Sequence, residues 1–207
     1  MLPVLLACSP GTPPPPVAPE PVGEGSVAPV PRAATADGRA LRVPTDAGEL
    51  TVHAVHHGTM VLSLGSTTVW VDPWSQGDLT GHPPADVLLI TDIHPDHLDA
   101  DAIAKVTTDS TIVVAPKAVD DALEHPVAHV LANGESVTVA GIGITATPMY
   151  NLVRGPEEGG LFHDPGRGNG YLLEVGGRRL YIAGDTECTP EMKALKQIDV
   201  AFVPMNL

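Results

Sequence analysis

The sequence predicts an α/β fold, in which layers of strands and helices pack around one core. Short apolar or alternating runs, typical of strands, recur between residues 50 and 203. Three stretches of helical character, beginning near residues 100, 116 and 190, interrupt these runs. Hydrophobic residues make up 43% of the 207 residues, which is enough for a sizeable core in a single domain.

The N-terminal 45 residues lack this pattern. Residues 1–8 read MLPVLLAC, and the end of this segment resembles the box that precedes a lipidated cysteine in bacterial lipoproteins. We therefore expect a remnant of a lipoprotein signal at 1–8, with Cys8 as the lipidation site. An apolar N-terminus with a chance cysteine is the alternative, because no basic start precedes the box. Residues 9–45, rich in Pro, Ala, Gly and Val, predict a Pro-rich disordered tether.

Residues 46–207 are expected to form the domain. Gly65-Ser66 and Gly176-Gly177 are turn signals between paired strands. Asp99 fits the N-cap of a helix at 100–106, and Pro116 fits the first turn of the next helix. Strands are predicted at 50–56, 60–64, 67–71, 87–90, 112–115, 129–131, 136–140, 142–147, 171–175, 179–183 and 200–203, with a third helix at 190–196.

Charge and composition exclude some partners. A net charge of −14 argues against binding to the phosphate backbone of nucleic acids, which requires clustered Lys and Arg. No run of 18 apolar residues occurs, so we expect membrane contact only through the lipid anchor. The expected location is the bacterial cell envelope, on its periplasmic or outer face, with the cytoplasm as the alternative. Cys8 and Cys188 are too few for a disulfide framework, and we expect Cys188 to be a small buried residue.

A cluster of histidines and aspartates follows the strand predicted at 87–90. The segment reads LLITDIHPDHLD, and Pro95 disfavours a helix before it, so the cluster is predicted to lie on a loop at the end of a buried strand. Two imidazoles and two carboxylates within six positions suit a divalent cation of borderline softness, whereas a solvated acidic surface is the alternative. The predicted metal ligands are Asp92, His94, Asp96 and His97.

This segment resembles the His-x-His-x-Asp-His signature of the metallo-β-lactamase superfamily, with Asp92 in place of the first histidine. His163, before a Gly-rich turn and a strand, resembles the third motif of that family. Gly184-Asp185-Thr186 resembles the turn that carries its bridging carboxylate. The resemblance extends from about residue 50 to the end and implies an αββα sandwich. Since no histidine follows His163, we expect the domain to lack the C-terminal elements of this sandwich.

The resemblance also implies the composition of the site. It implies two divalent metal ions, with Zn²⁺ favoured and Mn²⁺ or Fe²⁺ as alternatives. It assigns positions 92 and 94 to one metal and positions 96 and 97 to the other, with Asp185 between them. Asp96 is expected to hold the proton of the nucleophile, and Asp72 to brace the ligand loop by hydrogen bonds. His57 resembles a family position near the site.

Asp92 departs from the common signature and has a physical consequence. Carboxylates at positions 92, 96 and 185 would give the site one negative charge more than the usual ligands do. We expect this charge to raise the pKa of a metal-bound water. Oxygen ligands also shift the preference from zinc toward manganese or iron.

These residues predict a metal-dependent hydrolase, in which a metal-activated hydroxide attacks an ester, a lactone or a phosphodiester-type substrate. The partner is then a small molecule, whose identity the fold class does not determine. Two alternatives stay open, namely a non-catalytic metal-binding or interaction module and an inactive fragment of the hydrolase.

Overall fold

The computed structural model describes residues 40–205, so Cys8 and most of the expected tether lie outside the described residues. The end of the expected tether is not a tether, because Ala40–Thr45 form strand β1. This strand pairs along its whole length with β2 (Gly48–His56), and its Val43 is fully buried. Pro44 is compatible with this strand because β1 lies at the edge of its sheet, where a missing N–H costs little. Residues 40–45 are therefore part of the folded domain, although we expected them in the tether.

Two sheets form the centre of the molecule. The first has seven strands in chain order, and the second has five in the order β12-β11-β10-β9-β8. The remaining strands of the first sheet are β3 (Thr59–Leu64), β4 (Thr67–Val71), β5 (Val87–Leu89), β6 (Ile112–Ala115) and β7 (His129–Val130). The second sheet contains β8 (Ser136–Val139), β9 (Ile142–Met149), β10 (Gly168–Val175), β11 (Arg178–Ile182) and β12 (Val200–Phe202).

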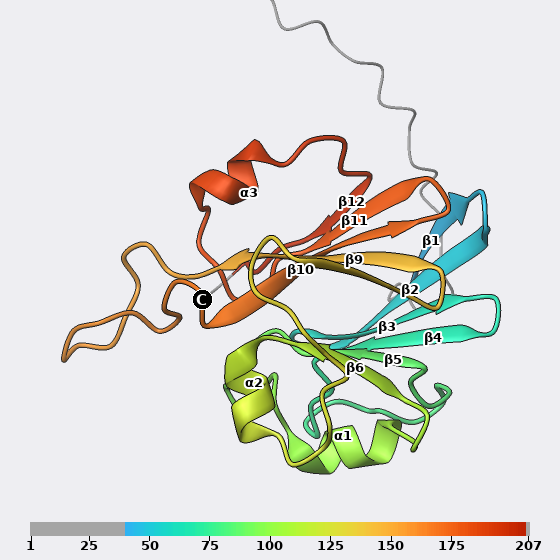
Figure 1. Cartoon of the computed structure of the whole chain (residues 1–207), viewed down its shortest axis with the longest axis horizontal. Helices are drawn as coiled ribbons and strands as arrows, with labels where there is room; N and C mark the ends of the chain where they lie inside the picture. The colour runs from blue at the N-terminus through green and yellow to red at the C-terminus, as the bar shows by residue number, and fades with distance from the viewer. Residues whose placement is uncertain (1–39, 206–207) are drawn as a thin grey trace, which may run out of the picture.

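Helices cover the outer faces of both sheets. Figure 1 shows α1 (Ala100–Val106) and α2 (Lys117–Ala122) outside the first sheet, and α3 (Pro190–Ala194) outside the second. The predicted αββα sandwich is thus confirmed. Asp99 caps α1 as expected, since its carboxylate accepts a hydrogen bond from the backbone N–H of Ala102. No helix within residues 40–205 is long and apolar enough to cross a membrane.

The apolar runs are explained by burial on both faces of the sheets. Val87 and Leu89 of β5 face the core between the two sheets, where Tyr171 and Leu173 of β10 pack against them in one cluster. Leu88, between these two residues, faces the other way and packs in the cluster under α1 and α2. A strand buried on both sides has no polar alternation, which accounts for the continuous hydrophobic sequence from 87 to 90.

The two sheets are in direct backbone contact at the start of β10, which begins three residues before the predicted strand. The backbone N–H of Asn169 donates to the carbonyl of Thr91, just after β5. A Cβ atom on Gly168 would lie 2.2 Å from Cε of Met149 and 2.8 Å from the Thr91 carbonyl oxygen. Gly168 is therefore required by this contact rather than by the turn that the sequence suggested.

Candidate metal centre

Seven histidines and aspartates converge at one end of the sandwich, in two groups. In each group the potential ligand atoms all lie within 4.8 Å of one another. The loops that carry them follow β5, β9 and β11, and one turn joins β2 to β3. We call the first group, formed by His57, Asp96, His97 and Asp185, the His97 group. We call the second, formed by Asp92, His94 and His163, the Asp92 group.

The six predicted ligands thus lie in these two groups. Positions 92 and 94 share one group and 96 and 97 the other, as the resemblance implied, whereas Asp185 is a member of the His97 group alone. His57 joins them as a seventh residue, and its Nε2 lies 3.0 Å from Oδ2 of Asp96. It lies on the tight β2–β3 turn in a left-handed conformation, with a φ of +50°. From the sequence its position was noted, but no role could be given.

His97 is held in one orientation by a buried network. Its Nδ1 lies 2.8 Å from Oδ2 of Asp72, which also accepts a hydrogen bond from the Thr91 hydroxyl. The backbone N–H of Thr91 donates to the other oxygen of Asp72. The bracing contact expected of Asp72 is therefore present. A neutral or protonated His97 would donate from Nδ1 to this carboxylate, which leaves Nε2 directed toward the site.

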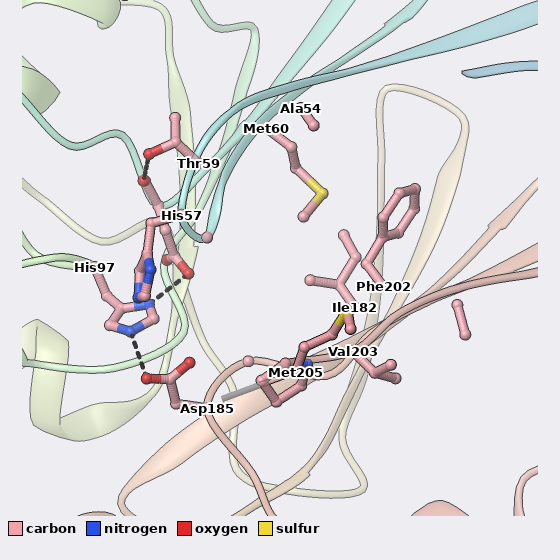
Figure 2. Close-up of a pocket in the computed structure, with 15 residues that line it drawn as sticks. Ala54, His57, Thr59, Met60, His97, Ile182, Asp185, Phe202, Val203 and Met205 are labelled. Carbon is pink, nitrogen blue, oxygen red and sulfur yellow. Dashed lines mark hydrogen bonds and ion pairs between the residues drawn. The ribbon is translucent and has the colours of Figure 1, made fainter. Parts of the chain in front are cut away.

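The Nε2 atom of His97 fits a bound cation. It is buried and has no hydrogen-bond partner in the described structure, yet it lies 3.3 Å from Oδ2 of Asp185 and 3.6 Å from Oδ2 of Asp96. Figure 2 shows the ring of His97 directed at Asp185. Buried polar atoms are normally satisfied, so an unsatisfied nitrogen between two carboxylates is the arrangement that a divalent ion would complete.

The charges around His97 are strongly coupled. Burial opposes its protonated form, but the carboxylates of Asp72 and Asp185 outweigh this effect and raise the pKa of His97 to about 11. Burial likewise opposes ionisation of Asp185, yet His97 and His163 hold its pKa below the ordinary value. Without a metal, a proton on His97 therefore supplies the positive charge between these carboxylates, at ion-pair distance but without a hydrogen bond from Nε2.

Asp72 has an unusual backbone conformation, which its neighbours stabilise. Its φ of +42° lies in the left-handed region, which is uncommon for a residue other than glycine. The Thr59 hydroxyl donates to its carbonyl at 2.6 Å, and its own N–H donates to the carbonyl of Leu89. The turn after β4 is thus fixed at both ends, so that the carboxylate reaches His97.

His163 is oriented by Asn151, which the sequence did not single out. The Asn151 Oδ1 atom accepts hydrogen bonds from the backbone N–H of His163 and from its Nδ1, at 2.9 and 2.8 Å. The Nε2 atom then points to Oδ2 of Asp92 and Oδ2 of Asp185, at 3.7 and 3.8 Å. Burial lowers the pKa of His163, which favours the neutral ring that a metal ligand requires. Asp185 therefore lies near both groups.

Asp92 is paired with Arg167, which sequence analysis also missed. The fully buried carboxylate accepts a hydrogen bond from Nε of Arg167 at 3.0 Å and another from Nη2 at 2.8 Å. This bidentate pair holds the permanent positive charge of Arg167 against Asp92, the residue that departs from the family signature. The extra negative charge that we expected at Asp92 is thus offset, which removes the main reason for a raised pKa of a bound water.

Cys188 belongs to neither group. It is a free cysteine and is exposed, so the expectation of a buried residue is wrong. It follows Asp185 by three residues in the loop that leads to α3, outside the apolar clusters, where packing does not require burial.

A cleft of about 650 Å³ opens beside the His97 group. His57, His97 and Asp185 form one wall, and the apolar side chains of Met60 and Phe202 lie across from them (Figure 2). Within residues 40–205, the lining of this cleft includes no member of the Asp92 group. In the part of the chain that the structure describes, this cleft borders the His97 group and is not lined by the Asp92 group.

Comparison with known proteins gives consistent results. The sequence profile described as Beta-lactamase superfamily domain matches residues 51–206. A protein of Methanoculleus marisnigri named UPF0173 metal-dependent hydrolase is 30% identical over 146 residues, which cover 69% of this chain and 62% of that protein. A protein of the same name from Thermus thermophilus is 26% identical over 163 residues, covering 75% and 70%. The chain thus spans about two thirds of the length of these relatives.

A solved structure extends the similarity to three dimensions. A metal-dependent hydrolase candidate from Parabacteroides distasonis superposes with a TM-score of 0.74 at 40% sequence identity. The match covers 81% of this chain and 75% of that one.

Proposed function

The chain belongs to the β-lactamase superfamily, and from this membership and the geometry of its two ligand groups we propose that it is a metal-dependent hydrolase. The observation that carries the proposal is the buried Nε2 of His97, which lacks a hydrogen-bond partner in the described structure and faces two carboxylates. We propose two divalent ions, one in each group, with zinc favoured and manganese or iron as alternatives.

A bound divalent ion supplies hydroxide at neutral pH and polarises the bond to be cleaved. The residues of the chain have separate tasks around it. Asp72 and Asn151 orient the two buried imidazoles through their Nδ1 atoms. Asp96 would take the proton of the attacking water on Oδ2, and Nε2 of the exposed His57, 3.0 Å away, would pass it toward solvent.

The walls of the cleft favour one part of the proposed substrate range. Apolar side chains line the side opposite the ligands, and none of the 15 lining residues is Lys or Arg. Among the described lining residues, a phosphodiester would find only the proposed metal ion and histidines, and no Lys or Arg, to balance its negative charge. We therefore propose a carboxylic ester or lactone with an apolar substituent, ahead of a phosphodiester.

The test measures hydrolysis of a p-nitrophenyl ester, an aliphatic lactone and bis-p-nitrophenyl phosphate by metal-depleted protein, before and after addition of Zn²⁺ or Mn²⁺. We expect ester or lactone turnover that depends on metal and is lost in His97→Ala. His53→Ala, which alters a histidine outside both groups, is the matched control. Metal binding without turnover of any substrate would favour the non-catalytic module, and turnover that survives chelation would contradict the proposal.

The location is a separate proposal. We propose that Cys8 is lipidated and tethers the domain in the bacterial cell envelope. Mass analysis of the N-terminal peptide after expression with a complete export signal tests this, with Cys8→Ser as the control. An unmodified cysteine in a soluble fraction would favour the cytoplasmic alternative.

A further inference from the structure

We infer that Arg167 makes the two metal positions unequal, so that the His97 group binds its ion first and the Asp92 group binds a second ion more weakly. This inference rests on the proposed function and concerns how many metals the protein holds. It follows from the fixed charge that the fold places inside one group and not the other.

The position of the guanidinium is fixed by three acceptors. Nε and Nη2 of Arg167 donate to the two oxygens of Asp92, and Nη2 also donates to the carbonyl of Phe162 at 2.9 Å. Both oxygens of a fully buried carboxylate are thus already engaged. A metal ion in this group would have to share Asp92 with the arginine or displace a bidentate ion pair.

The same guanidinium also borders a second ligand. Nη2 of Arg167 lies 3.3 Å from Nε2 of His94, while Nδ1 of that ring lies 3.2 Å from Oδ2 of Asp92 and 3.1 Å from Nε2 of His163. A divalent ion among these atoms would therefore lie a few ångströms from a like charge. An arginine does not lose its proton in proteins, so this repulsion cannot be relieved by titration.

The His97 group has no such neighbour. In the described structure its carboxylates, Asp96 and Asp185, form ion pairs only with histidine rings. The His97 group offers Asp96, His97 and Asp185 as ligands, with His57 assigned to proton transfer, and the Asp92 group also offers three, so ligand number does not separate the two groups. Local charge therefore favours the His97 group for the first ion.

Metal binding itself tests the inference, without reference to activity. Metal-depleted protein is titrated calorimetrically with Mn²⁺ and with Zn²⁺, and bound metal is counted by elemental analysis. We expect one tight step and a second step at least about tenfold weaker. Arg167→Gln should strengthen the second step by about tenfold or more, and Arg167→Lys, which keeps the charge, should leave it weak. Arg178→Gln, which removes an arginine paired with Asp199 far from both groups, should change neither step.

Each outcome decides one question. Two equal steps in the natural protein, or an unchanged second step in Arg167→Gln, would overturn the inference while leaving the proposed function standing. Absence of any bound metal would overturn the proposed function instead. If Arg167→Gln does not fold, the double variant Arg167→Gln/Asp92→Asn removes both charges together. We expect it to retain the first step at its natural affinity, and loss of that step would overturn the inference.

Discussion

The His97 group and the Asp92 group contain the same residue types and lie at the same end of the sandwich, yet their surroundings differ. The His97 group borders the cleft, and its central imidazole is placed between carboxylates. No described residue of the Asp92 group lines that cleft, and an arginine engages its buried carboxylate. The comparison indicates that ligand type does not by itself determine how a site binds metal. The neighbouring charge should matter as much: His97 can give up its proton to a metal, whereas Arg167 keeps its positive charge.

The largest effect is expected from removing the ligand at the centre of the first group. His97→Ala should lower metal-dependent hydrolysis by more than about 100-fold, since loss of even an outer partner of a ligand costs 10–100-fold. Steady-state assays at saturating metal check this. If His97→Ala kept more than a tenth of the activity while His163→Ala lost it, the roles that we assign to the two groups would be exchanged.

Removing the brace of His97 should have the next largest effect. Asp72→Asn keeps the shape of the side chain but removes the charge that Nδ1 of His97 faces at 2.8 Å. We expect the tight metal step to weaken by about 10–100-fold, with the second step little changed. Competition with a chromophoric chelator measures both steps, and far-UV circular dichroism checks that the variant is folded. Equal weakening of both steps would mean that Asp72 stabilises the whole centre rather than one group.

The two steps should also differ in their dependence on pH. With the pKa of His97 raised to about 11 in the metal-free protein, a metal must displace a proton there, so the tight step should strengthen roughly tenfold for each pH unit between 7 and 9. The pKa of His163 is lowered instead, so the second step should be nearly constant over this range. Calorimetry in buffers of different ionisation enthalpy counts the protons released. A tight step that releases none would contradict the charge state assigned to His97.

The smallest effect is expected in the second group. Asn151→Ala removes the acceptor that orients His163 and should weaken only the second step, by about tenfold or less. Its measurement is the same titration. Since Asn151 is buried, thermal unfolding of the metal-free variant is compared with that of the natural protein, and a weakened first step would indicate a general loss of structure.

Features encoded locally could be predicted from the sequence. The apolar runs gave most strands to within a few residues, and the capping carboxylate of Asp99 was found where the helix begins. Strand β1 was missed because the prolines before it and Pro44 within it suggested a tether. Its alternation of apolar residues becomes meaningful only once β2 lies beside it.

Features that depend on the packing of the two sheets could not be predicted. Arg167 meets Asp92 across 75 residues of sequence, and neither position carries a pattern that points to the other. Asn151 looked like an ordinary residue after a strand, although it determines which nitrogen of His163 faces the other members of the Asp92 group. The candidate ligands were recognised from their motifs, whereas the residues that orient and neutralise them were visible only in three dimensions.

The contact at Gly168, where the start of β10 meets the loop after β5, has a consequence for the proposed metal centre. Because Gly168 has no side chain, β10 can lie directly on the loop that carries Asp92. One backbone contact thus sets the distance between the two sheets at this point. A methyl group there would collide with Met149 and the Thr91 carbonyl and would lie 3.3 Å from Oδ1 of Asp92, so it would push on the loop that carries this candidate ligand. The proposed metal centre is therefore sensitive to substitution of a glycine that offers no ligand atom itself.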